Sequence, residues 1–148
     1  MALNAVNICN MALTRIGANT ITSLTDGTRE SNLCNTVYEN SVEDVLSMGE
    51  WSKAKFQATL VQLDAPAFDY SYAYQLPTAP RIITLLDVQD AKASSVEYTI
   101  QGDHLLINNT ADQITYIGYL DNPADYGVYL KAAIISKIAY ELAFTLTG

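Results

Sequence analysis

The chain has 148 residues, 49% of them apolar, and sixteen acidic residues against eight basic ones give it a net charge of −8. A chain of this length forms one ordinary domain, and this apolar content builds a core without disulfides or a metal ion. The acidic excess argues against a surface that wraps nucleic acid, because carboxylates repel phosphates. We therefore expect a single domain over residues 1–148.

The N-terminal sequence also argues against export or membrane insertion. MALNAVNICNMALTRIG places three asparagines where a signal peptide needs an unbroken apolar core, and no small-residue cleavage site is recognisable. No segment approaches the ~18 uninterrupted apolar residues of a membrane span. We expect a soluble protein that is made in the cytoplasm and does not enter a membrane.

Two helices are predicted at the start of the chain. Apolar residues recur at steps of three and four over about 3–16, and Gly17 offers a C-terminal stop. A second periodic run covers about 28–48, with Thr28 as its N-cap and Gly49 as its stop. We expect these two helices to pack against each other as an antiparallel pair.

Beyond Trp51 the apolar period changes to two, which is typical of strands. Five runs fit this pattern within the region from about 56 to 120, namely 56–63, 82–86, 96–100, 105–107 and 113–120. The QGD at 101–103 separates two of them, so 96–107 is predicted to be a hairpin in which Gly102 supplies the positive φ of the turn. The strands are expected to form one small antiparallel sheet.

The stretch YSYAYQLP alternates tyrosine with small residues at Tyr70, Tyr72 and Tyr74. In an extended chain the three rings would lie on one side. They could be part of the core, a platform for sugars or bases, or a docking surface. We favour the core or an interface, because tyrosine is enriched where one end of the ring is buried and the other is wet. Pro77 ends the segment, since it cannot donate to a ladder.

A third helix is predicted over about 123–147, with Asn122 as N-cap and Pro123 at the first helical position. Its apolar residues occupy more than one side. One stripe runs through Val128, Ala132, Ile135, Ala139, Leu142 and Leu146, and Leu130, Ile134 and Ile138 lie off it. A helix that is apolar over most of its circumference is covered on several sides, so we expect a neighbouring subunit to supply part of the cover. The resulting fold class is α+β, an antiparallel helical bundle with an inserted sheet.

Residues for catalysis, metal binding or cofactor binding are not apparent. His104 is the only histidine, and no GxSxG, Walker, GxGxxG, HExxH or calcium-loop motif occurs. Carboxylate pairs for glycoside hydrolysis could be drawn from Asp64, Asp69, Asp87 or Asp90, but a chain this acidic always provides such pairs. We expect no enzymatic activity, no metal and no cofactor.

Cys9 and Cys34 both lie in apolar segments and form no CxxC motif. The simplest interpretation is two small buried thiols in a reducing compartment. A disulfide between the first two helices is the alternative. Structural zinc is excluded in practice, because too few ligands are present.

Six segments, read in chain order, resemble one protein family: NICNMALTRIGANTITSLTDGT, LCNTVYENSVEDVLSMGEWSKAK, YAYQLPTAPRIITL, VEYTIQGDHLLINN, ITYIGYLDNPADY and KIAYELAFTLTG. The most specific pieces are the "N-x-A-L-x-x-I-G" of the first segment, the W-S-x-A from Trp51, the YAYxLP followed by Arg81, and the Y-x-I-x-G ending at Gly102. Together they resemble the head-to-tail connector (adaptor) proteins of tailed bacteriophages, which include tail tubular protein A and the packaged-DNA-stabilising head completion proteins.

The resemblance covers nearly the whole chain and implies a helical bundle with an inserted β-sheet. It implies a virion protein of the neck that forms a ring, typically a dodecamer, between the portal and the tail or nozzle. DNA would pass through the lumen without sequence-specific binding. Family members usually continue past the third helix towards the portal, whereas the present sequence ends at Gly148.

Within such a ring each subunit uses two different surfaces for its two neighbours. We interpret Tyr70, Tyr72, Tyr74, Ile134 and Ile138 as subunit or partner interface residues. Four further residues are expected to have structural roles: Trp51, Pro77, Arg81 and Gly102. The alternative function is a carbohydrate-binding virion or host-surface module that uses the tyrosines and Trp51.

Overall fold

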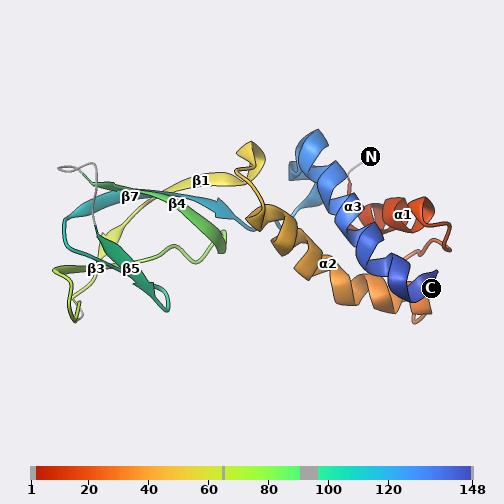
Figure 1. The fold of residues 1–148 in the computed structure, drawn as a ribbon, viewed down its shortest axis with the longest axis horizontal. Coiled ribbons are helices and arrows are strands. Elements are labelled where there is room, and N and C mark those ends of the chain that lie inside the picture. Colours follow the sequence, from red (N-terminus) through yellow and green to blue (C-terminus); the bar gives the residue numbers. More distant parts are fainter. Residues whose placement is uncertain (1–2, 65, 91–96, 148) are drawn as a thin grey trace. The chain divides into compact units, whose positions relative to one another are not determined.

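A computed structural model describes residues 3–64, 66–90 and 97–147 (Figure 1). The chain divides into two compact units. Unit 1 comprises Met1–Ala54 and Tyr119–Gly148, and unit 2 comprises Lys55–Gly118. Within the described residues the structure contains three α-helices and two antiparallel sheets, so the predicted α+β class is confirmed. That the chain folds as a single cooperative domain stays a prediction.

Helix α1 (Ala5–Arg15) begins with an asparagine capping box and ends before a glycine. The side chain of Asn4 accepts the N–H of Asn7 at 2.9 Å, and the Asn7 side chain accepts the N–H of Asn4 at 3.0 Å. This reciprocal capping box satisfies N–H groups that the first turn leaves free. At the other end Gly17 has φ 73°, and the N–H that follows it donates to the Leu13 carbonyl at 3.0 Å, as in a Schellman motif. The predicted stop is confirmed.

Helix α2 (Arg29–Ser47) begins as predicted, because Thr28 Oγ1 accepts the N–H of Ser31 at 3.1 Å. Helix α3 (Gly127–Leu146) begins later than predicted. Asn122 does cap, but its side chain accepts the N–H of Ala124 in a short 3₁₀ turn, η2 (Pro123–Asp125). The Asn-Pro signal therefore marked a separate turn that precedes the helix.

Helix α3 is the common partner of the other two helices in unit 1 (Figure 1). Both α1 and α2 pack mainly on α3, and they contact each other much less. The expectation that the first two helices chiefly cover each other is therefore wrong. The physical reason is the composition of α3, whose apolar residues extend round enough of its circumference to receive two helices.

The buried side of α3 overlaps the predicted stripe only in part. Its buried residues are Leu130, Ile134, Ile135, Ile138 and Leu142, of which Ile135 and Leu142 were predicted to lie on the stripe. Val128, which began the predicted stripe, is 72% exposed. Leu130, Ile134 and Ile138, which were predicted to lie off the stripe, are thus part of the buried side. Helices α1 and α2 pack on α3 in unit 1.

Unit 2 contains two sheets where one was predicted, and all their strand pairs are antiparallel. The first has the order β1-β7-β4, with β1 (Lys55–Thr59), β7 (Ala111–Gly118) and β4 (Ile82–Asp90). The second has the order β2-β3-β6-β5, with β2 (Val61–Gln62), β3 (Tyr72–Gln75), β6 (His104–Ile107) and β5 (Tyr98–Gln101).

The predicted hairpin corresponds to β5 and β6, which pair from Tyr98↔Ile107 to Gln101↔His104. Gly102 lies at the turn with φ 61°, as predicted. The first part of that prediction, up to residue 96, lies outside the described residues.

A shared apolar cluster forms the core of unit 2. The four-stranded sheet contributes Tyr74, Leu105 and Ile107, and the three-stranded sheet contributes Ile114 and Tyr116. Because both sheets contribute side chains to this cluster, each covers an apolar face of the other. The strand that carries Tyr74, β3, was not among the five predicted strands.

Candidate functional site

The tyrosine segment is divided between a turn and a strand. Tyr70 lies in the turn before β3, where its N–H donates to the Ala67 carbonyl at 3.0 Å. Tyr72 and Tyr74 lie two apart in β3 and share one face of it, as the alternation predicted. Tyr72 is half-buried against the core cluster of unit 2, and Tyr74 belongs to that cluster. The three rings therefore do not form one open platform.

Tyr74 has a specific structural role in unit 2. Its side chain is 4% exposed, and its Oη accepts the backbone N–H of Ala111 at 3.1 Å. Ala111 begins β7 in the three-stranded sheet, whereas Tyr74 lies in the four-stranded sheet. The hydroxyl thus joins the two sheets and satisfies a buried backbone donor, which is costly to leave unpaired.

Ile134 and Ile138 were predicted to form an interface, and their burial requires a correction. Both are fully buried among the helices of unit 1, so they are not available to a neighbouring subunit. The sequence places apolar residues on two sides of α3, and the packing of α1 and α2 covers the side that contains these two. The side that remains exposed contains different residues.

We define the outer face of α3 by six of its exposed residues, none of which carries a charge: Val128, Tyr129, Ala132, Ser136, Tyr140 and Phe144. The rings of Tyr140 and Phe144 meet edge to face with centroids 5.9 Å apart. Lys137 Nζ lies 5.4 Å from the centroid of the Tyr140 ring and 3.0 Å from the Glu141 carboxylate. We call the rings of Tyr140 and Phe144 the aromatic ridge, and Lys137 lies beside it with its partner Glu141.

Sequence reasoning missed the outer face because it assigned the wrong phase to the helix. The charge pattern gives no signal for this face. Lys131, Lys137 and Glu141 are partly buried, whereas Tyr129 and Tyr140 are exposed. Charged residues normally mark the solvent side of a helix, so a prediction from charge would also have chosen the wrong side.

A hollow of about 480 Å³ lies between α1 and α3. Its lining consists of Asn7, Asn10, Met11, Thr14, Arg15 and Ile135. Arg15 also contacts the outer face of α3, because its Nη1 donates to Ser136 Oγ at 2.9 Å. The hollow therefore borders the outer face of α3 at Ser136 and combines apolar surface with polar and cationic groups.

The four predicted structural residues occupy different places. Trp51 is half-buried in unit 1, and its Nε1 donates to the Val45 carbonyl in the last turn of α2 at 2.7 Å. It also lines a smaller hollow of about 150 Å³ with residues at the start of α3. In unit 2, Pro77 is half-buried beyond the end of β3, Arg81 is exposed immediately before β4, and Gly102 lies in the β5–β6 turn.

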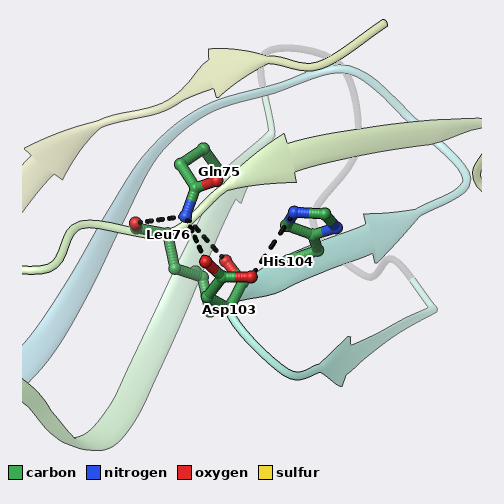
Figure 2. A network of polar contacts seen from close by, with 4 residues as sticks. All are labelled: Gln75, Leu76, Asp103 and His104. Carbon is green, nitrogen blue, oxygen red and sulfur yellow. Dashed lines mark hydrogen bonds and ion pairs between the residues drawn. The ribbon is translucent and has the colours of Figure 1, made fainter. Parts of the chain in front are cut away.

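The only histidine belongs to a network that fastens the β5–β6 turn, as Figure 2 shows. Gln75 Nε2 donates to the carbonyl oxygens of Leu76 and Asp103, each at 3.2 Å, and to the Asp103 carboxylate at 3.1 Å. That hydrogen bond from Gln75 is the main cause that lowers the pKa of Asp103. His104 Nε2 lies 3.4 Å from the same carboxylate. The hydrogen bonds from Gln75 to Asp103 tie the turn to β3.

Cys9 and Cys34 are both buried and free. The hydrogen bond with Cys34, together with burial, raises the pKa of the Cys9 thiol well above its usual range. A thiol that stays protonated is a poor nucleophile and metal ligand. In the part of the chain that the structure describes, no three residues among His, Cys, Asp and Glu are placed to hold a metal ion.

No helix among the described residues is long and apolar enough to cross a membrane. Comparison of the sequence with protein-family models finds no match, and comparison with curated proteins finds none either.

Proposed function

We propose that this chain is a structural protein of a bacteriophage neck, forming a dodecameric ring that joins the portal of the DNA-filled head to the tail or nozzle. The sequence resemblance over nearly the whole chain supports the proposal. The arrangement of the elements agrees with it, since the terminal helices share unit 1 and both sheets come from the segment between them. In this proposal α1, α2 and α3 form the antiparallel helical bundle of a connector.

One observation carries most of the weight: the outer face of α3 is apolar and exposed on an acidic chain. Tyr129 is 84% exposed and Phe144 74%. Large exposed apolar patches on a soluble protein mark surfaces that bind a partner. A subunit that is covered by its neighbours needs such a surface, whereas an enzyme needs a concave site with reactive groups.

The net charge fits passage of DNA through the ring. A dodecamer of a chain with a charge of −8 carries about −96 in total, and lumenal carboxylates would repel the phosphates of the genome. Such repulsion would let DNA slide without sticking. The ring therefore needs no sequence-specific contact with DNA and no catalytic residue.

Negative-stain imaging of the protein mixed with its portal tests the proposal. We expect an additional ring beneath the portal, with the symmetry of a closed head-to-tail assembly. Portal particles that remain unchanged at saturating amounts of a correctly folded protein would contradict the proposed function.

A carbohydrate-binding virion or host-surface module is the alternative. It depended on Trp51 and the tyrosines, but Tyr74 is buried and the indole N–H of Trp51 is already bonded to Val45. What remains in its favour is the small hollow that Trp51 lines together with Lys53 and Tyr129. Binding on a glycan array by a protein that stays monomeric would favour this module over the connector.

A further inference from the structure

We infer that the outer face of α3 in one copy of this chain seats on the hollow between α1 and α3 of another copy. The inference deepens the proposed connector function, because it names the two mating surfaces of the subunit. Both surfaces belong to unit 1, so the contact depends on the fold of that unit alone.

The amount of exposed apolar surface is the first argument. Tyr129, Tyr140 and Phe144 are 84%, 60% and 74% exposed. Aromatic side chains present roughly 150–250 Å² each, so these three rings offer about 450 Å² per copy. A standard interface buries about 800 Å² per partner, and rings of this kind form its centre. The outer face therefore provides more than half of what a stable contact between two copies needs.

The shape and chemistry of the hollow form the second argument. The hollow is shallow and open to solvent, so it can receive the side of another helix and does not enclose a ligand. Met11, which is 40% exposed, and Ile135 supply apolar surface in the hollow. Asn7, Thr14 and Arg15 place amide, hydroxyl and guanidinium groups beside them. A tyrosine ring has the same two requirements, an apolar body and a polar end.

Charge complementarity is the third argument. Arg15 is exposed, and its Nη1 donates to the neutral hydroxyl oxygen of Ser136. A guanidinium is attracted to the negative face of an aromatic ring. Two copies that each carry −8 repel through most of their surface. They can approach closely where one surface is uncharged and the other presents a cation.

Two variants test the contact from its two sides. In the first, Tyr140→Lys combined with Phe144→Lys removes the ridge and also lowers the net negative charge, so general repulsion cannot explain lost association. In the second, Met11→Glu places a carboxylate in the hollow, four residues before Arg15, where it pairs with the guanidinium on the same helix. All three positions are exposed, so the helices are expected to form in both variants. Circular dichroism and thermal unfolding check this.

Met48→Glu is the matched control, because Met48 is 68% exposed beyond the end of α2 and belongs to neither surface. It changes the charge by the same amount as Met11→Glu. Sedimentation velocity is measured for the four proteins up to about 1 mM subunit, where even contacts of a few kcal/mol are populated.

The wild type and Met48→Glu are expected to associate in a concentration-dependent manner. Each surface variant is expected to lose at least about 30-fold in association constant, the factor that corresponds to an interface hot spot. A mixture of the ridge variant and the hollow variant retains one intact ridge and one intact hollow. It is therefore expected to form one-to-one pairs that neither variant forms alone.

A wild-type chain that stays monomeric throughout the concentration series would overturn the inference, as would surface variants that associate like Met48→Glu, or a mixture that forms no pairs. The proposed connector function fails by a different result, namely the absence of a ring on the portal. If the wild-type chain associates only as far as a dimer, this result would support the ridge-and-hollow contact but would contradict a ring.

Discussion

The hydroxyl groups of Tyr38 in α2 and Tyr126, directly before α3, lie 2.9 Å apart and share one hydrogen bond inside unit 1. Tyr126 is 1% exposed, so its hydroxyl has been withdrawn from water. The bond joins residues that are far apart in the sequence and fixes the entry of α3 against α2. It is therefore a sensitive point for the stability of this unit.

Replacing one hydroxyl should cost more than replacing both. Tyr38→Phe leaves the buried hydroxyl of Tyr126 without its partner, and we expect a loss of about 1–3 kcal/mol in the free energy of unfolding. The double variant with Tyr126→Phe should cost less than the sum of the two single variants, because no buried hydroxyl is then left unpaired. Urea unfolding of the four proteins of this cycle provides the measurement. Additive losses would show that the two hydroxyls do not depend on each other.

The same pair predicts an alkaline limit to stability. Burial raises the pKa of Tyr38 from 10.0 to about 12, and burial also raises the pKa of Tyr126. Above pH 10 an unfolded tyrosine loses its proton while the folded one keeps it, so the free energy of unfolding falls as pH rises. We expect this contribution to be complete below pH 10 and to be lost as pH approaches about 12. Ultraviolet titration of phenolate should show fewer late-titrating groups in the Tyr38→Phe/Tyr126→Phe variant. An unchanged titration would contradict the assignment.

Tyr74 should be sensitive to the loss of a single oxygen atom. Tyr74→Phe removes the acceptor of the Ala111 N–H, and we expect a destabilisation of about 1–3 kcal/mol. Tyr74→Ala should cost about 3–5 kcal/mol, because it also leaves a cavity in the core. Tyr72→Phe, on the same strand but half-buried, is the control, with an expected change below about 0.5 kcal/mol. Equal effects of the two Phe substitutions in chemical denaturation would refute the role given to Tyr74.

Gly118 and Gly102 should resist substitution for different reasons. A Cβ at Gly118 would lie 2.9 Å from Phe56 Cδ2 and 3.0 Å from Pro80 Cβ, so Gly118→Ala overpacks unit 2 and should cost about 1–3 kcal/mol. A Cβ at Gly102 would meet nothing within 4 Å, but φ is 61°, and backbone strain there costs about 1–2 kcal/mol. Adding Phe56→Leu should recover part of the stability lost in Gly118→Ala and none of that lost in Gly102→Ala. Thermal unfolding of the two double variants decides this.

Trp51 is the only tryptophan and should contribute modestly to the end of α2. The Val45 carbonyl accepts the indole N–H at 2.7 Å and also the N–H of Met48 at 3.1 Å. Because this carbonyl keeps one donor, Trp51→Phe should cost only about 0.5–1.5 kcal/mol from the lost hydrogen bond. Circular dichroism during urea unfolding measures it. A loss well above that range would mean that the packing of the indole contributes more than its hydrogen bond.

The local features of this protein were determined by its sequence. Thr28, Gly17 and Gly102 were predicted correctly because capping and positive φ depend on a few neighbouring residues. The change from helical to strand periodicity correctly predicted two helices, a region of strands and a third helix, because each element needs one apolar side in its own period. The strand β3 was not predicted, but alternation correctly placed Tyr72 and Tyr74 on one side of an extended segment.

Only the tertiary structure decided which side of an apolar element is covered. Leu130, Ile134 and Ile138 became the buried side of α3 because α1 and α2 both pack there, and periodicity cannot choose between two apolar sides of one helix. The separation of the strands into two sheets likewise depends on pairing between distant segments, such as β1 with β7. The large apolar residues that α3 exposes are therefore Tyr129, Tyr140 and Phe144, whereas Ile134 and Ile138 are buried. Exposure is a property of the packed unit, and the sequence of a single helix does not contain it.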